Sequence, residues 1–120
     1  MKIAVVGTGY VGLVTGTCFA ETGNKVTCVD IDKSKVEKLS AGQITIYEPG
    51  LEKIFLRNIK EERLKFTTNL EEAVEDAEII FLALPTPPGA DGSADLKYVL
   101  GVADHLGKIL KGYKVIVNKS

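Results

Sequence analysis

Three glycines near the start of the chain have the spacing of a turn that binds a diphosphate. Gly7, Gly9 and Gly12 fit the pattern G-x-G-x-x-G directly after a short apolar run at residues 3–6. The first glycine of such a turn permits a tight bend, the second lets a pyrophosphate approach the backbone, and the third lets helix and strand pack closely. The N–H groups at the start of the following helix then bind the diphosphate. We expect a nucleotide site here rather than a glycine-rich turn without a ligand.

An acidic residue follows the glycines at the distance that a ribose contact requires. Asp30 ends the second apolar run, about 20 residues beyond the turn, where a carboxylate accepts hydrogen bonds from an adenosine ribose. A carboxylate there repels the 2′-phosphate of NADP and favours NAD, although Lys33 and Lys35 partly offset its charge. The competing interpretations are a strand-end cap for Asp30 and an ordinary solvated lysine for Lys35.

The remaining reactive residue types do not form a catalytic or metal-binding pattern. Cys18 falls on the apolar side of a predicted helix and Cys28 inside a predicted strand, so both are expected in the core with a raised thiol pKa. His105 lies on a polar helix face without a second His or Cys at metal-ligand spacing. We therefore expect no catalytic nucleophile and no metal site in these residues.

Short apolar runs alternate with helical patterns along the whole chain. This alternation predicts an α/β fold with a doubly wound parallel sheet (a Rossmann fold) in three α-β-α layers, with strand order 3-2-1-4-5, as one domain over residues 1–120. Proline and glycine between residues 85 and 93 predict a long loop. The expected strands are residues 3–6, 25–30, 64–67, 78–84 and 114–117, and the expected helices are residues 10–22, 32–39, one opened by Pro49, 70–76 and one capped by Asp95.

Composition excludes several classes of function. The 120 residues carry a formal net charge of −1 with scattered basic residues, which argues against a nucleic-acid partner. The first apolar run is far shorter than the ~20 residues of a membrane span. Two cysteines without a signal peptide are typical of reduced thiols, so we expect a cytoplasmic protein.

Three strings of residues together resemble the UDP-glucose/GDP-mannose dehydrogenase family. They are residues 7–13 (GTGYVGL), 47–51 (YEPGL) and 84–87 (LPTP) with 91–96 (DGSADL), and they follow the family's order over residues 1–120. The glycine turn is shared by many families, whereas the other two strings are far more discriminating. Within the family the chain is most similar to the members that oxidise UDP-glucose, whose glycine turn commonly continues as Tyr-Val-Gly-Leu.

The resemblance implies NAD as the cofactor and a nucleotide sugar as the substrate of the full-length protein. It implies a two-step, four-electron oxidation of the sugar C6 alcohol to a carboxylate, with two NAD molecules and a cysteine thioester. The family's catalytic residues belong to later sequence, so we expect a truncated N-terminal cofactor part that is inactive alone, from a protein that is a homodimer when full length. The cofactor-binding residues implied by the resemblance are Gly7, Gly9, Tyr10, Val11, Gly12, Asp30, Lys35, Leu84, Pro85, Thr86, Pro87 and Ser120.

Three alternatives remain open. The nucleotide sugar could be GDP-mannose or UDP-N-acetylmannosamine in place of UDP-glucose, because the residues that read the sugar and the base are mostly absent. A stand-alone nucleotide-sensing Rossmann module has similar length, but the segment around Glu48 and the loop at residues 85–93 do not fit it. An S-adenosylmethionine methyltransferase also uses a glycine-rich turn and an acidic residue on ribose. The choice of ligand separates these classes.

Overall fold

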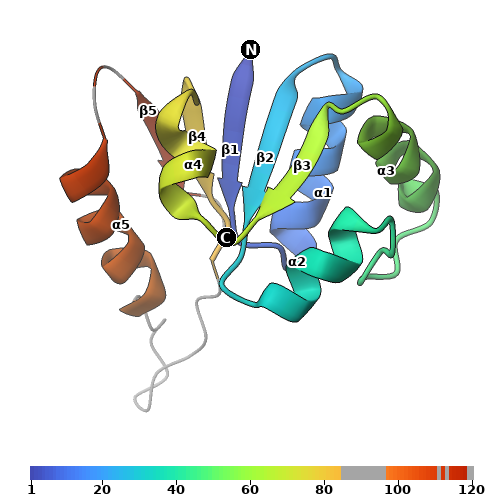
Figure 1. Ribbon diagram of the computed structural model, residues 1–120, viewed down its shortest axis with the longest axis horizontal. Coiled ribbons are helices and arrows are strands. Elements are labelled where there is room, and N and C mark those ends of the chain that lie inside the picture. Colours follow the sequence, from blue (N-terminus) through green and yellow to red (C-terminus); the bar gives the residue numbers. More distant parts are fainter. Residues whose placement is uncertain (85–96, 111, 113, 119–120) are drawn as a thin grey trace.

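A five-stranded parallel sheet forms the centre of the molecule (Figure 1). The computed structural model describes residues 1–84, 97–110, 112 and 114–118. The strand order is β3-β2-β1-β4-β5, and each pair of neighbours is parallel. This confirms the predicted doubly wound fold and its order 3-2-1-4-5. The strands are β1 (Lys2–Val6), β2 (Lys25–Val29), β3 (Leu64–Thr67), β4 (Ile79–Leu82) and β5 (Val115–Asn118).

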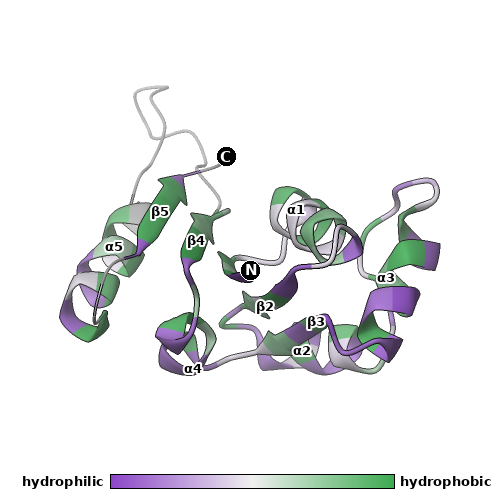
Figure 2. Cartoon of the chain, turned by 90° about the horizontal axis from the view of Figure 1, so that it is seen from above, coloured by the Kyte–Doolittle hydropathy of each residue, from purple (hydrophilic) through white to green (hydrophobic). Residues whose placement is uncertain are grey.

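Helices cover both faces of the sheet and make three layers. In the view from above, α1 lies on one side of the sheet, and α4 and α5 lie on the other (Figure 2). Ile3 and Val5 of β1 pack in one core with α1, α2 and α3, whereas Ala4 and Val6 pack in the other core with α4 and α5. The helices are α1 (Tyr10–Glu21), α2 (Lys33–Ser40), α3 (Leu51–Lys60), α4 (Leu70–Glu75) and α5 (Lys97–Ile109).

The apolar run at the start of the chain explains why β1 is central. Residues 3–6 are all buried, because successive side chains of a strand point to opposite faces and both faces are covered. β1 pairs with β2 on one side and with β4 on the other. The strand order therefore reverses between β1 and β4, which is where ligands bind in open α/β sheets.

Side chains cap two of the helices, and one predicted helix start is wrong. The Asp32 carboxylate accepts a hydrogen bond from the Lys35 N–H, and the Asn69 side chain accepts one from the Glu72 N–H, each at 3.1 Å. Pro49, however, does not open α3. The chain instead makes a Pro-Gly turn, in which the Leu51 N–H donates to the Glu48 carbonyl at 3.1 Å and Gly50 has φ 81°.

Candidate cofactor site

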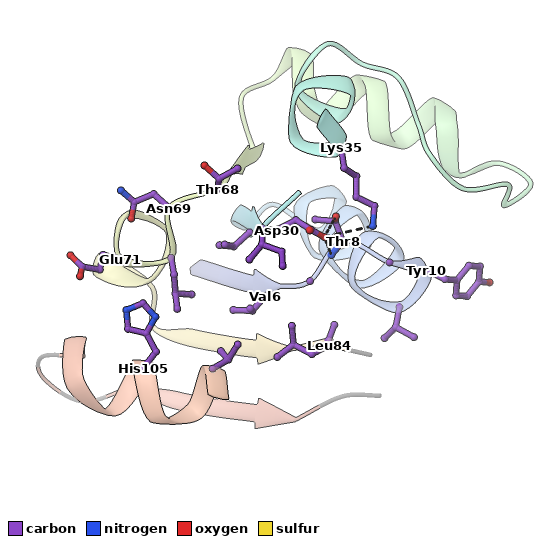
Figure 3. A pocket seen from close by; sticks show the side chains of 18 residues that line it. Val6, Thr8, Tyr10, Asp30, Lys35, Thr68, Asn69, Glu71, Leu84 and His105 are labelled. Carbon is purple, nitrogen blue, oxygen red and sulfur yellow. Dashed lines mark hydrogen bonds and ion pairs between the residues drawn. The ribbon is translucent and has the colours of Figure 1, made fainter. Parts of the chain in front are cut away.

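A large pocket lies at the carboxyl ends of the strands, over the point where the strand order reverses (Figure 3). Its volume is about 1220 Å³, enough for an extended dinucleotide. Its walls come from four strand ends and from residues of α1, α2, α4 and α5. The residues that line it are Val6–Val11, Val29–Ile31, Lys35, Thr68–Glu71, Ala83, Leu84, Val102 and His105.

The first and third glycines of the turn are required by close backbone packing. Gly7 has φ +107°, and a Cβ on it would lie 2.3 Å from the Ala83 carbonyl oxygen. A Cβ on Gly12 would lie 2.0 Å from the carbonyl oxygen of Gly7. The turn is further held by the Gly7 N–H, which donates to the Val29 carbonyl at 2.7 Å. These contacts join β1, β2 and the end of β4 at the base of the pocket.

The second glycine leaves the start of α1 open toward the pocket. Apart from Gly9 itself and its two chain neighbours, no described residue has an atom within 4 Å of a Cβ built on Gly9. Gly9 is the N-cap of α1 and makes no side-chain capping bond, and the first turn of α1 contains no acidic residue. The first N–H groups of a helix have no partner within the helix, and they carry its positive dipole end. This end of α1 therefore fits a diphosphate, as the glycine spacing predicts.

Asp30 lies beside this helix end and is held in one orientation. Its Oδ2 accepts hydrogen bonds from the Thr8 hydroxyl at 2.6 Å and from the Thr8 N–H at 3.1 Å, and the Lys35 ammonium lies 3.6 Å from the same oxygen. Burial raises the pKa of Asp30, but the hydrogen bonds from Thr8 and from the Asp32 N–H, together with the charge of Lys35, outweigh it and lower the pKa. The carboxylate is therefore charged at neutral pH and can accept hydrogen bonds from a sugar diol.

A side-chain hydrogen bond attaches the segment before α3 to the glycine turn. The Tyr10 hydroxyl donates to Glu48 Oε2 at 2.5 Å, and this bond, followed by the negative charge of Glu48, raises the pKa of Tyr10. Tyr10 also lines the pocket. The second string that carries the family resemblance, residues 47–51, thereby lies next to the first.

The structure brings most of the predicted cofactor residues together. Gly7, Gly9, Tyr10, Val11, Asp30, Lys35 and Leu84 all line the pocket, and Gly12 packs beneath the turn. Pro85, Thr86, Pro87 and Ser120 lie outside the described residues. The sequence did not point to Thr8, nor to the wall made by residues 68–71, Val102 and His105. Only the position of Thr8 inside the glycine motif, with a hydroxyl on its side chain, was a usable signal.

The two cysteines differ from each other in burial. Cys28 lies in β2 and is buried, and burial raises its pKa to about 12, as expected for a core thiol. The prediction for Cys18 is wrong, because Cys18 is exposed. α1 lies against the sheet and α3 through Leu13, Gly16, Thr17 and Ala20, which leaves Cys18 on its outer side. Neither thiol lines the pocket.

The described residues contain neither a cluster of metal ligands nor a helix able to span a membrane. Across residues 1–84 and the described part of residues 97–118, no three His, Cys, Asp or Glu side chains are grouped so that they could bind a metal ion. Within the same residues, no helix has the length and apolar character needed to cross a membrane. His105 is exposed, as predicted, but it lies at the wall of the pocket.

Comparison with known proteins shows the family to which the chain belongs. The model of the UDP-glucose/GDP-mannose dehydrogenase family, NAD binding domain, matches residues 1–120. The chain is 56% identical to the UDP-glucose 6-dehydrogenase TuaD of Bacillus subtilis, over 99% of this chain and 26% of that protein. It is therefore homologous to the N-terminal domain of an NAD-dependent UDP-glucose 6-dehydrogenase.

Solved structures give the same fold and the same partial coverage. A UDP-glucose dehydrogenase from Pyrobaculum islandicum superposes with a TM-score of 0.93 at 43% identity, over 99% of this chain and 28% of that one. A GDP-mannose dehydrogenase from Pseudomonas aeruginosa superposes with a TM-score of 0.95 at 32% identity, over 100% of this chain and 28% of that one. The chain thus spans about a quarter of the length of these relatives. It belongs to the UDP-glucose/GDP-mannose dehydrogenase family and corresponds to the NAD-binding domain of that family.

Proposed function

We propose that the pocket over β1 and β4 binds NAD, with the pyrophosphate at the start of α1 and the adenosine ribose at Asp30 and Lys35. The observation that carries this proposal is the uncapped helix end at Gly9 next to the charged Asp30 carboxylate. A diphosphate and a ribose diol are the two groups that this pair of features matches. The nicotinamide then extends along the carboxyl end of β4, past Leu84.

The other cofactor contacts are assigned by the family resemblance. Tyr10 and Val11 contribute the first N–H groups of α1 toward the pyrophosphate. The resemblance also assigns Leu84, Pro85, Thr86, Pro87 and Ser120 to cofactor binding. Of these five, only Leu84 belongs to the described residues, and it supports the assignment because it lines the pocket.

The whole protein, in our proposal, oxidises UDP-glucose to UDP-glucuronate. Bound NAD supplies the hydride acceptor, and the residues described above hold and orient it. The 56% and 43% identities to UDP-glucose dehydrogenases, against 32% to a GDP-mannose dehydrogenase, support UDP-glucose over GDP-mannose. The residues that perform the oxidation, that select the sugar and that form a homodimer lie in the part of the relatives that this chain does not span.

Binding of NAD by the chain itself is the first prediction. We expect NAD at about 100 times its Kd to stabilise the fold by about 2.7 kcal/mol, because the ligand binds only the folded state. Thermal unfolding with NAD, NADP and S-adenosylmethionine in parallel measures this. A higher melting temperature with S-adenosylmethionine alone would contradict the proposal and favour a methyltransferase. An unchanged melting temperature with all three ligands would contradict an independent NAD site in this chain.

Stoichiometry tests the reaction proposed for the whole protein. With UDP-glucose and excess NAD, the full-length protein is expected to form two NADH per sugar, because oxidation of an alcohol to a carboxylate removes four electrons. NADH absorbance at a limiting amount of UDP-glucose measures this ratio, and parallel reactions with GDP-mannose and UDP-N-acetylmannosamine are the controls. Turnover of one of these two sugars without turnover of UDP-glucose would assign a different substrate. A nucleotide sensor would oxidise none of them.

A further inference from the structure

Thr8 is the middle residue between the first two glycines of the turn, and its side chain is completely buried. A buried hydroxyl is costly unless it is hydrogen-bonded. Both donors of Thr8, the hydroxyl and the backbone N–H, reach the same atom, Asp30 Oδ2, at 2.6 and 3.1 Å. Thr8 lies beside Asp30, in the turn between β1 and α1 (Figure 3). Both hydrogen-bond donors of Thr8 are therefore committed to Asp30.

These two bonds make the oxygens of the Asp30 carboxylate inequivalent. A carboxylate oxygen accepts about two hydrogen bonds. Thr8 supplies two donors to Oδ2, and the Lys35 ammonium lies 3.6 Å from this oxygen as well. Oδ1 accepts one bond, from the Asp32 N–H at 3.0 Å. One acceptor position therefore remains on Oδ1, and Lys35 remains as a neighbouring donor.

We propose that Thr8 is a positioning residue that fixes the rotation of the Asp30 carboxylate, and that it thereby sets the preference for NAD over NADP. This inference rests on the proposed function, since it needs the adenosine ribose at Asp30. With Oδ2 held by Thr8, one ribose hydroxyl donates to Oδ1 and the other accepts from Lys35. A carboxylate held there cannot turn away from a 2′-phosphate, and its attraction for Lys35 keeps that ammonium from pairing with the phosphate. Thr8 touches neither hydroxyl and acts only through Asp30.

The test compares Thr8→Val, which removes the hydroxyl at nearly constant volume, with Thr8→Ser, which keeps it. Titration calorimetry gives the Kd of NAD and of NADP for each variant. Thr8→Val is expected to raise the Kd of NAD about tenfold, because a carboxylate free to rotate loses about one hydrogen bond with the ribose, and to raise the Kd of NADP less. The Kd of NADP divided by the Kd of NAD is therefore lower in Thr8→Val than in the unmodified chain. Thr8→Ser is expected to keep the unmodified ratio. An equal rise in both Kd values would overturn the inference, because a general loosening of the turn weakens both cofactors alike.

A double-mutant cycle with Asp30→Ala separates this inference from the proposed function. If Thr8 acts through Asp30, then Thr8→Val changes the Kd of NAD much less in the Asp30→Ala background than in the unmodified chain. Additive effects would overturn the role of Thr8 and leave the NAD site standing. An unchanged Kd in Asp30→Ala alone would overturn the ribose assignment and the inference with it. Thr8→Ala replaces Thr8→Val in the same cycle if the valine variant does not fold.

Discussion

Replacing Gly12 with alanine is expected to lower the melting temperature of the chain by about 10 °C, which corresponds to about 3 kcal/mol, the upper end of typical overpacking costs. The added Cβ would lie 2.0 Å from the Gly7 carbonyl oxygen, and the atoms in conflict are backbone atoms that cannot rotate away. α1 must then move off β1, which disturbs the base of the pocket. Thermal unfolding followed by circular dichroism measures the loss, and calorimetry is expected to show weaker NAD binding.

The matched control is the same substitution three residues earlier. Gly9→Ala adds a Cβ where no described atom lies within 4 Å, at a residue whose φ of −74° suits any L-amino acid. We expect little change in melting temperature, but a Kd for NAD at least about tenfold higher, because the methyl group occupies the space where the pyrophosphate approaches. Equal melting temperatures for Gly12→Ala and Gly9→Ala would contradict the close packing of α1 on the turn.

Removing the Asp30 carboxylate is expected to change both the affinity for the cofactor and the choice between cofactors. Asp30→Ala loses at least one hydrogen bond between a ribose hydroxyl and a charged acceptor, so the Kd of NAD is expected to rise about 10- to 100-fold. The Kd of NADP is expected to rise much less, because the carboxylate no longer repels the 2′-phosphate. In the unmodified chain the Lys35 ammonium lies 3.6 Å from Asp30, and in the variant it is free to pair with the phosphate. Calorimetric titration of each variant with both cofactors measures the ratio.

Asp32→Ala is the control for this change. Asp32 caps α2 through its side chain, and its own N–H, which donates to Asp30, is retained in alanine. Loss of the cap is expected to reduce stability by about 1 kcal/mol without altering the ratio of the NADP and NAD Kd values. The assignment of the ribose to Asp30 would be contradicted if both variants changed this ratio equally.

The parts of the fold that were predictable follow from local patterns. Each of these patterns can be recognised from residues that are close together in the sequence. They are the buried run in β1, the spacing of Gly7, Gly9 and Gly12, and the individual apolar runs and helical patterns that alternate along the chain. The order 3-2-1-4-5 is one of the few common orders to which the rules for right-handed crossovers restrict such an alternation. Asp30 was predictable because the length of a βαβ unit places the end of its second strand beside the turn.

The parts that were missed depend on contacts between distant residues. The partnership of Thr8 with Asp30 arises only when β1 and β2 pair in register. The exposure of Cys18 depends on which side of a mostly apolar helix meets α3, and apolar spacing does not decide that for α1. Pro49 was misplaced because a Pro-Gly turn and a proline-opened helix share the same residues, and the left-handed Gly50 decides between them.

The close approach of Gly7 and Gly12 to each other and of Gly7 to Ala83 makes the glycine turn depend on a residue that is synthesised much later. A ribosome releases the glycine turn first, yet the strand that supports it from below, β4, is made only after β2 and β3. Until then a nascent chain has neither the central strand pair nor a closed floor for the cofactor. We therefore expect the first βαβ unit alone to lack a complete floor for the cofactor, and the proposed NAD site to require the sheet through β4.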